Sequence, residues 1–237
     1  MLGASTSAVV PGRAGAPRDD FLAALGPRLA GELAATGSRR TFARGHAIFH
    51  QGQPPDRVLV LLSGRVKVTT TTSAGREVVL AFRRPGDLIG ELAVLAHTPR
   101  SATVSAVEPV EALSIRPEAF HAFVAAHPEV ALLLIEMLSR RLRDSDAKRI
   151  EFSTFTTIQR VAARLLEFAE RFGAEDATGI RIALPITQEE LAGATGSSLE
   201  SVGRALQTMR SLKCVETRRR EIRILEPRAL QDLLAVD

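Results

Sequence analysis

The stretch PGDLIGELAVLAHTPRSATV, residues 85–104, combines the residue types that a buried anion site requires. Gly90 lets the backbone approach a ligand closely, and the short run that begins at Glu91 can form one helical turn with free N–H groups. Arg100 and Ser101 can offer a guanidinium fork and a hydroxyl to phosphate oxygens. Glu91 can accept hydrogen bonds from a sugar hydroxyl and also orient Arg100. These residues therefore predict a site for one phosphate and one ribose.

Within this stretch, GELAVLAHTPRSAT resembles the phosphate-binding cassette of cyclic-nucleotide-binding domains, and its Arg-Ser pair is the bacterial form of that motif. The resemblance implies that a cyclic nucleotide, cAMP in the first place and cGMP in the second, binds to Gly90, Glu91, Leu92, Arg100 and Ser101. The alternative is a domain that has kept its shape and lost its ligand, in which Glu91 and Arg100 form an ordinary ion pair.

Short β-type runs separated by glycines surround the cassette, from Arg40 to Ile115. Five glycines fall between or beside these runs, where a positive φ causes no Cβ strain: Gly45, Gly52, Gly64, Gly75 and Gly86. Many short strands at regular spacing predict a barrel or roll. The pattern also resembles the double-stranded β-helix of the cyclic-nucleotide family. With the helical run that precedes it, residues 19–127 are expected to form one β-roll domain.

The composition is typical of a globular protein, with 45% hydrophobic and 24% charged residues among 237. No apolar run approaches the roughly 18 residues that span a bilayer, so we expect no membrane segment. Residues 1–18 lack the pattern of a secretory signal and are expected to be a disordered tail. Cys214 alone cannot form an internal disulfide, which favours the cytoplasm. The five histidines have no metal-ligand spacing, and we expect no metal site.

Residues 128–155 contain no glycine and no internal proline, and we expect them to form a long helix and the hinge after it. An apolar stripe at two-helix spacing predicts a homodimer seam through residues 130–152, with Leu134, Met137 or Leu138, Leu142, Ser145, Arg149 and Phe152 as its members. The alternative is burial of the stripe on the chain's own roll. In the family that the cassette resembles, this helix completes the ligand pocket. The resemblance implies a ligand contact from Ser145, which stands where the family has a threonine, and places Arg141 beside the pocket glutamate. Asp146 departs from the family, because it stands where a hydroxyl residue contacts the ligand across the dimer, but its carboxylate can still accept a hydrogen bond from an amino group.

The second decisive stretch is ITQEELAGATGSSLESVGRALQTMRSL, residues 186–212. Thr187 and Glu190 have the spacing of a capping box, Gly196 makes a tight turn, and Ser197 or Ser198 can cap a second helix. Helix, glycine turn and helix at this size predict a helix-turn-helix whose second helix enters the major groove of DNA. Packing of two helices without DNA binding is the alternative.

The segments on either side complete the prediction of a winged helix over residues 156–237. Before the stretch we expect an amphipathic helix that ends at Gly173, a polar loop over residues 174–179 and a strand over residues 180–184. After it comes a basic hairpin, residues 214–225. Within residues 186–212, the small residues Ala192 and Gly203 are expected to let the two helices pack closely.

Glu200 and Arg204 are four residues apart and therefore share one face of the second helix. Glutamate accepts from cytosine N4 and arginine binds guanine, so the pair can read G·C positions. Both match base-reading residues of the cyclic-AMP receptor protein and Fnr family. Leu199 resembles the Fnr branch, and it can touch a thymine methyl but cannot read guanine. Further DNA contacts are expected at Thr187, Gln188, Ser198, Arg218, Arg219 and Arg220.

The chain is thus identified as a member of the Crp/Fnr family of transcription regulators, and the resemblance covers about residues 20–235. The expected fold class is α+β, with a cyclic-nucleotide-binding β-roll, a long dimerisation helix and a C-terminal winged helix-turn-helix. The expected partners are palindromic double-stranded DNA, a cyclic nucleotide, a second copy of the chain and RNA polymerase. The alternatives are a regulator of this type that senses haem-bound gas or needs no ligand, and an enzyme such as a cyclic-nucleotide hydrolase. An enzyme is disfavoured because the sequence has no clustered His/Asp metal site and no nucleophile–base pattern.

Overall fold

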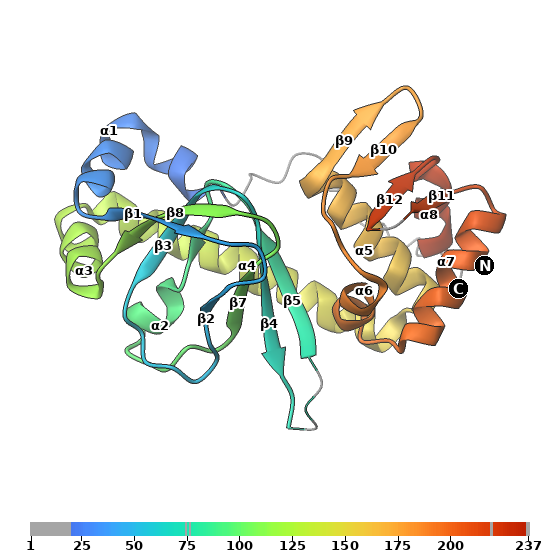
Figure 1. Cartoon of the computed structure of the whole chain (residues 1–237), viewed down its shortest axis with the longest axis horizontal. Helices are drawn as coiled ribbons and strands as arrows, with labels where there is room; N and C mark the ends of the chain where they lie inside the picture. Colours follow the sequence, from blue (N-terminus) through green and yellow to red (C-terminus); the bar gives the residue numbers. More distant parts are fainter. Residues whose placement is uncertain (1–19, 74, 76, 219, 236–237) are drawn as a thin grey trace, which may run out of the picture.

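The computed structural model describes residues 20–73, 75, 77–218 and 220–235. Its N-terminal half is a β-roll, its C-terminal half combines helices with a small sheet, and a long helix connects the two (Figure 1). The predicted α+β class is confirmed. The predicted tail over residues 1–18 and the side chain of Arg219 lie outside the described residues.

The N-terminal half contains two antiparallel four-stranded sheets, in the strand orders β1-β8-β3-β6 and β2-β7-β4-β5. They enclose an apolar interior that includes Leu59, Leu61 and Ile89. The elements are α1 (Phe21–Ala35), β1 (Ser38–Phe42), β2 (Ala47–Phe49), β3 (Val58–Ser63), β4 (Val66–Thr71), β5 (Glu77–Arg83), β6 (Leu88–Ile89), α2 (Glu91–Leu95), β7 (Thr103–Ala106), β8 (Val110–Ile115) and α3 (Pro117–Ala126). Helix α3 was not predicted, although Pro117 at its first position is a helix-start signal.

The turns of the roll depend on glycine where the sequence predicts it. A positive φ, between 74° and 90°, is present at all five positions: Gly45, Gly52, Gly64, Gly75 and Gly86. At Gly64 a Cβ would lie 2.1 Å from the carbonyl oxygen of Pro109, so no other residue fits there without a shift of the backbone.

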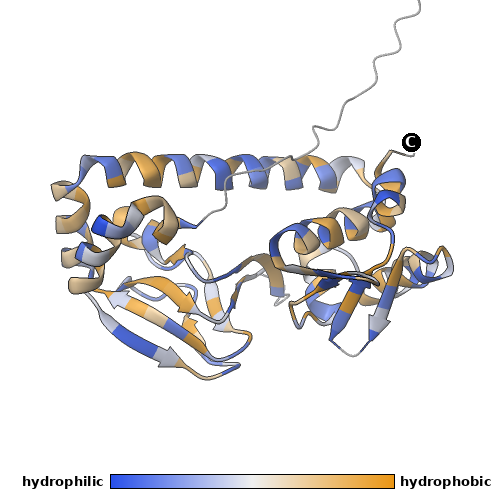
Figure 2. Ribbon diagram, turned by 90° about the horizontal axis from the view of Figure 1, so that it is seen from above, coloured by the Kyte–Doolittle hydropathy of each residue, from blue (hydrophilic) through white to orange (hydrophobic). Residues whose placement is uncertain are grey.

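Helix α4 (Pro128–Thr154) is apolar on two sides and runs along both halves of the molecule (Figure 2). The side that packs on the roll is buried at Val130, Leu134 and Met137. The opposite side exposes four large apolar residues: Leu132, Ile135, Leu142 and Ile150. The prediction that placed Leu134 and Met137 in a dimer seam is therefore wrong, since both pack on the chain's own roll. The apolar spacing expected of a dimer seam is present on both sides of this helix, and only the packing shows which side faces the roll.

Among the described residues, no helix is by itself long and apolar enough to cross a bilayer. Helices α3 and α4 reach that length and hydropathy only when taken together, and they meet at a bend of 109°.

The C-terminal half contains an antiparallel sheet in the order β11-β12-β10-β9. Its elements are α5 (Thr157–Phe172), β9 (Gly173–Asp176), β10 (Gly179–Ile182), α6 (Gln188–Thr195), α7 (Leu199–Ser211), β11 (Val215–Arg218), β12 (Glu221–Ile224) and α8 (Pro227–Leu234). The loop predicted over residues 174–179 is wrong in its first half, because β9 pairs with β10. All residues of β9 are exposed, so no apolar alternation marks it in the sequence. Helix α8 was not predicted either.

Strand β5 of the roll joins the two halves, because α6 packs against it. Val79 and Phe82 of β5 belong to the apolar core of the C-terminal half. The Phe82 ring meets Phe168 edge-on, with 5.5 Å between the ring centroids. Beside this contact, Lys67 Nζ of β4 lies 3.2 Å from Glu190 Oε1 of α6. This apolar core and this ion pair are among the contacts that hold the C-terminal half against the roll.

Candidate ligand cavity and nucleic-acid interface

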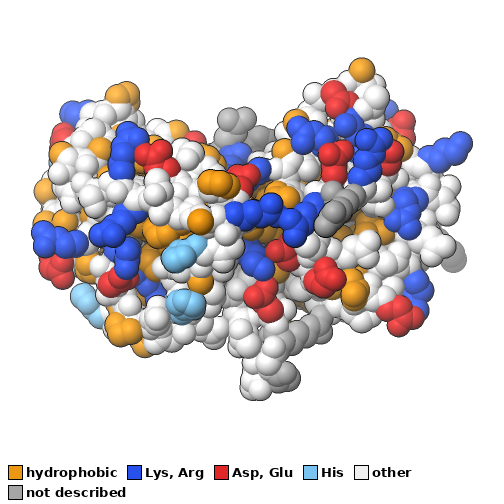
Figure 3. Space-filling view, viewed as in Figure 1, with side chains coloured by type: hydrophobic (Ala, Val, Ile, Leu, Met, Phe, Trp, Pro, Cys, Tyr) orange, Lys and Arg blue, Asp and Glu red, His pale blue; other side chains and the backbone are white. Residues whose placement is uncertain are grey.

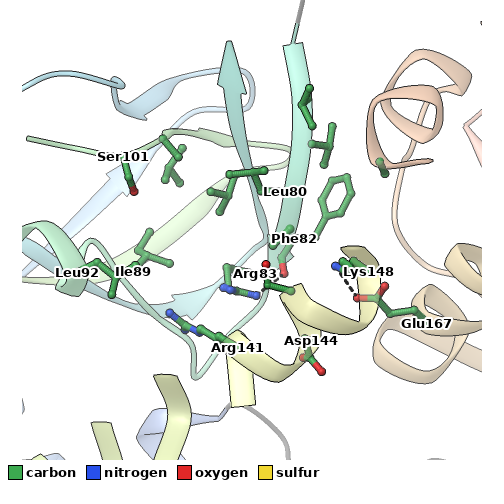
Figure 4. Close-up of a pocket in the computed structure, with 18 of the residues that line it drawn as sticks. Leu80, Phe82, Arg83, Ile89, Leu92, Ser101, Arg141, Asp144, Lys148 and Glu167 are labelled. Atoms are coloured by element: carbon green, nitrogen blue, oxygen red, sulfur yellow. Dashed lines mark hydrogen bonds and ion pairs between the residues drawn. The ribbon is translucent and has the colours of Figure 1, made fainter. Parts of the chain in front are cut away.

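A cavity of about 530 Å³ lies between the cassette, β5, α4 and α5 (Figure 4). Seven of the eight predicted ligand residues line it: Gly90, Glu91, Leu92, Arg100, Ser101, Arg141 and Ser145. The fold therefore brings residues of the cassette and of the long helix to one site, which is the arrangement that the resemblance implies.

Glu91 is buried at the start of α2 and is only 2% exposed. Arg141 Nη1 donates to Glu91 Oε1 at 2.6 Å, and Arg141 Nη2 donates to Leu88 O at 3.0 Å. Gly90 caps α2 with a φ of 83°, and a Cβ there would lie 2.6 Å from Arg100 Nη1. Arg141 thus lies beside the pocket glutamate, and only glycine fits between that glutamate and Arg100.

Arg100 is 4% exposed and held on several sides. Its Nη1 donates to Gly90 O at 2.9 Å, and its Nη2 donates to Arg57 O at 2.6 Å and to Asp56 Oδ1 at 3.1 Å. The guanidinium lies 3.8 Å from the centre of the Phe49 ring. Burial lowers the pKa of Arg100. Although burial alone would raise the pKa of Asp56, its hydrogen bonds to Arg57 and Arg100 lower it.

The two charged residues of the cassette therefore have different partners. The expectation that Glu91 orients Arg100 is wrong, because Glu91 pairs with Arg141 and Arg100 pairs with Asp56. The alternative of a direct ion pair between Glu91 and Arg100 is wrong for the same reason. Sequence reasoning missed Asp56, which lies 44 residues before Arg100 and belongs to no motif. It also missed Phe49, which looks like any apolar strand residue.

The remaining predicted ligand residues are less buried than Glu91 and Arg100. Ser101 of the cassette and Ser145 of α4 are exposed and line the cavity. Asp146 does not line the cavity of its own chain, and it accepts a hydrogen bond from Arg149 Nη2 at 2.9 Å. Its contact with the ligand of a partner subunit stays a prediction.

Four charged residues that sequence reasoning missed lie at the α5 side of the cavity: Lys148, Arg164, Glu167 and Arg171. All three cations contact Glu167. Lys148 Nζ lies 3.4 Å from Glu167 Oε1 (Figure 4), and Arg171 Nη1 lies 3.6 Å from the same oxygen. Arg164 Nη1 donates a hydrogen bond to Glu167 Oε2. Although burial alone would raise the pKa of Glu167, these three cations lower it to about 2. Burial lowers the pKa of Lys148. Arg164, Glu167 and Arg171 are three and four residues apart on one helix, so their ion pairs could have been predicted from the sequence. The contact of Glu167 with Lys148 of α4 could not, because no spacing in the sequence indicates it.

The described residues contain no group of three or more His, Cys, Asp or Glu side chains that could hold a metal ion. Cys214 is buried ahead of β11, and burial raises the pKa of its thiol. It packs in the apolar core of the C-terminal half as a small apolar residue.

The helix-turn-helix is built from local caps. Thr187 Oγ1 accepts from Glu190 N at 3.1 Å, and Glu190 Oε2 accepts from Thr187 N at 2.9 Å, which confirms the capping box. Gly196 ends α6 with a φ of 59°. Ser198 Oγ accepts from the backbone N–H three residues later, so Ser198 rather than Ser197 caps α7.

A second cavity, of about 290 Å³, lies between the N-terminal ends of α6 and α7 and the hairpin β11–β12. Five of the predicted DNA contacts line it: Thr187, Gln188, Leu199, Arg218 and Arg220. On the face shown in Figure 3, Lys and Arg side chains lie over the C-terminal sheet with acidic side chains among them. A concave surface that combines helix N-termini with arginines suits the phosphate backbone of DNA.

Glu200 and Arg204 share the outer face of α7, where their side chains are 77% and 65% exposed. Arg204 Nη1 donates to Glu200 Oε1 at 2.5 Å. Ala192 is buried in the core, as predicted, but a Cβ at Gly203 would meet nothing within 4 Å. The prediction that Gly203 allows close helix packing is therefore wrong, because this residue does not face another helix.

Comparison with known proteins matches a cyclic nucleotide-binding domain to residues 39–127 and a Crp-like helix-turn-helix domain to residues 159–233. The chain is 35% identical over 165 residues to the CRP-like cAMP-activated global transcriptional regulator of Mycobacterium tuberculosis, which covers 70% of this chain and 74% of that protein. It is 31% identical over 215 residues to the global nitrogen regulator of Synechocystis, covering 90% and 95%. The structure of a CRP-family transcriptional regulator from Thermus thermophilus matches with a TM-score of 0.71 and 27% identity, covering 83% and 97%.

Proposed function

Because this chain belongs to the Crp/Fnr family of DNA-binding transcription regulators, we propose that it is a homodimer whose binding to palindromic DNA is controlled by a cyclic purine nucleotide, cAMP in the first place. The observation that carries the proposal is the position of the cavity. Its walls come from the cassette, from α4 and from α5 of the DNA-binding half. A ligand in this cavity touches the ligand-binding domain and the DNA-binding domain at once.

The chemistry of the wall residues supports a position for each part of the nucleotide. The cyclic phosphate is placed at Arg100 and Ser101, whose N–H and O–H groups donate to anionic oxygens. The ribose hydroxyl is placed at Glu91, which is held in place by Arg141. The base extends toward α4, where Ser145 can donate or accept a hydrogen bond.

The contacts between the halves provide a route from this ligand to the DNA. Lys67 of the roll pairs with Glu190, and the same glutamate caps α6 at Thr187, a predicted DNA contact. At the end of α4, Phe152 lies against the turn of the helix-turn-helix, where a Cβ at Gly196 would be 2.7 Å from its ring. A ligand that moves α4 or β5 therefore changes the position of the DNA-reading helix.

Titration calorimetry with cAMP and with cGMP tests the ligand. Wild type is expected to release heat on binding, and Arg100→Leu is expected to lose several kcal/mol of affinity, because the ligand anion is left unpaired in a buried site. Arg39→Leu, on the exposed strand β1, is the matched control and should bind as wild type does. Identical isotherms for wild type and Arg100→Leu, or no heat from either, contradict the proposal.

The exposed side of α4 supports the proposed dimer. Leu132, Ile135, Leu142 and Ile150 form an apolar stripe that the chain itself does not cover. Leu142→Glu places two like charges at a two-fold seam, so we expect monomers in sedimentation velocity at micromolar concentration. Leu212→Glu changes an exposed leucine outside the stripe and should leave the dimer intact. A monomeric wild type would rule out the dimer.

RNA polymerase is the further partner that we propose, with the cytoplasm as the place of action, because the relatives compared above include transcriptional regulators. In vitro transcription from a promoter that contains the palindrome tests this partnership. A change in transcript yield that requires the protein, in either direction, supports it, and an unchanged yield on occupied DNA contradicts it.

A second candidate is a regulator of the same family that needs no nucleotide. The observation that favours it is that both cassette charges already have protein partners, Glu91 with Arg141 and Arg100 with Asp56. DNA binding measured with and without cAMP separates the two candidates. An increase in affinity with cAMP supports control by the nucleotide, and equal affinities support the second candidate.

A further inference from the structure

The side chain of Asp56 occupies the donor edge of Arg100 that a phosphate would use. A guanidinium carries five N–H groups in a fixed fork, and a phosphate binds in bidentate fashion to one of two edges, Nε with Nη2 or Nη1 with Nη2. Both edges include Nη2. In this structure Nη2 already donates to two acceptors, Asp56 Oδ1 and Arg57 O, and so uses both of its hydrogens.

A bidentate phosphate therefore has to displace one of these two acceptors. The bond to Arg57 O is short, at 2.6 Å, and its acceptor is a backbone carbonyl that cannot leave without moving β3. The bond to Asp56 is longer, at 3.1 Å, and its acceptor is a side chain that is 53% exposed. Displacing Asp56 exchanges one anion for another and needs no movement of a strand.

Asp56 also pairs with a second cation, Arg57, and this pair can persist after Asp56 leaves Arg100. Its Oδ2 accepts from Arg57 Nε at 2.7 Å and from Arg57 Nη2. The carboxylate can stay with Arg57 and turn to water while Arg100 binds another anion. Glu91 has no such freedom, because it is buried and held by Arg141.

We propose that Asp56 is an internal anion that occupies Arg100 until the phosphate of the ligand displaces it, and that it thereby sets the affinity of the site. The proposal rests on the proposed function, since it takes a cyclic nucleotide as the ligand. Without the ligand, Asp56 keeps the buried guanidinium paired and correctly placed. With the ligand, the same carboxylate competes with the phosphate and weakens binding.

Titration calorimetry of cAMP with Asp56→Asn tests the competition. The amide keeps the shape of the side chain and removes its charge, so we expect binding about three- to tenfold tighter than in wild type. Glu108→Gln is the matched control, because it neutralises another carboxylate of the roll, which pairs with Arg65 outside the cavity. This control should bind as wild type does. Thermal unfolding by circular dichroism shows that each variant is folded.

The double variant Asp56→Asn with Arg100→Leu shows whether the effect passes through Arg100. If it does, the gain disappears and the double variant binds as weakly as Arg100→Leu alone. Equal or weaker binding by Asp56→Asn, with wild type binding cAMP, overturns the proposal and leaves the proposed function standing. Binding by Asp56→Asn alone overturns displacement of Asp56 by cAMP and also removes cAMP as a ligand of the wild type. No binding by either folded protein overturns both claims.

Discussion

The charged residues of the cavity and those of the recognition helix α7 lie in opposite environments. Glu91 and Arg100 are almost completely buried, and each is paired with a residue from another part of the chain. Glu200 and Arg204 are largely exposed and are paired with each other on one helix face. A buried charge that loses its partner has no water to replace it, whereas an exposed one is solvated at once.

This difference teaches that the two sites respond to substitution in different ways. In the cavity, removing the partner of a buried charge should reduce stability and also change ligand binding. On the DNA-facing surface, removing a charge should change DNA binding and leave stability almost unaltered. The following predictions test this separation, from the largest expected effect to the smallest.

The largest effect is expected from Arg141→Ala. It leaves the carboxylate of Glu91 buried without its cation, and should lower the free energy of unfolding by about 3–5 kcal/mol. Urea unfolding at pH 7 measures this change. Arg39→Ala removes an exposed ion pair with Glu111 and should cost at most about 1 kcal/mol. Equal losses in the two variants would show that burial does not distinguish the pairs.

The next effect is a loss of folding stability at acidic pH, which we expect from Glu167. The pKa of Glu167, about 2, lies below the ordinary value of 4.5. A carboxylate whose pKa is lowered by folding contributes stability above its unfolded pKa and loses it as the pH falls through its folded pKa. We expect a loss of about 3 kcal/mol between about pH 4.5 and pH 2, measured by urea unfolding. Glu167→Gln should lack this loss and Glu200→Gln should keep it. An unchanged acid profile in Glu167→Gln would contradict the role of this residue.

A smaller effect, on DNA selectivity, is expected from Arg204→Ala. The arginine is expected to bind guanine in a half-site core resembling TGA, repeated as a palindrome with centres about 34–36 Å apart. Its loss should reduce discrimination at that position by about 1–3 kcal/mol, with the free energy of unfolding almost unchanged. Selection of sites from random DNA measures the change. Leu199 cannot read guanine, so recovery of a strict outer guanine, GTGA, would show that this interpretation of Leu199 is wrong.

The smallest effect is expected from Arg218→Ala in the wing. This arginine is expected to contact phosphate, so its loss should weaken binding to all sequences alike and lower the salt slope of the binding constant by about 0.9. Fluorescence anisotropy at several salt concentrations measures the slope. Arg28→Ala, an equally exposed arginine on α1, is the control and should not change it. A changed sequence preference in Arg218→Ala would instead indicate base reading by the wing.

Features that depend on near neighbours could be predicted from the sequence. The capping box of Thr187 and Glu190 and the turn at Gly196 are all present, because a cap or a tight turn depends on backbone groups within a few residues. The cassette placed Gly90, Glu91 and Arg100 at one cavity for a related reason, since they lie within eleven residues of one another.

Partners that are far apart in the sequence could not be predicted from spacing. Asp56 and Arg100 are 44 residues apart, and Glu91 and Arg141 are 50 apart. Arg141 was found only through the resemblance to a known family, and Asp56 was not found at all. Strand β9 was missed because all of its residues are exposed and show no apolar alternation.

By itself, the sequence determined the order of the roll, the long helix and the winged helix, together with the caps and turns that begin and end their elements. Only the tertiary structure decided which side of α4 faces the roll, which carboxylate holds Arg100 and where α6 packs on β5. The physical reason is the range of the interactions. Caps and turns are satisfied by neighbouring backbone groups, whereas a buried charge or an apolar stripe finds its partner only when distant segments have come together.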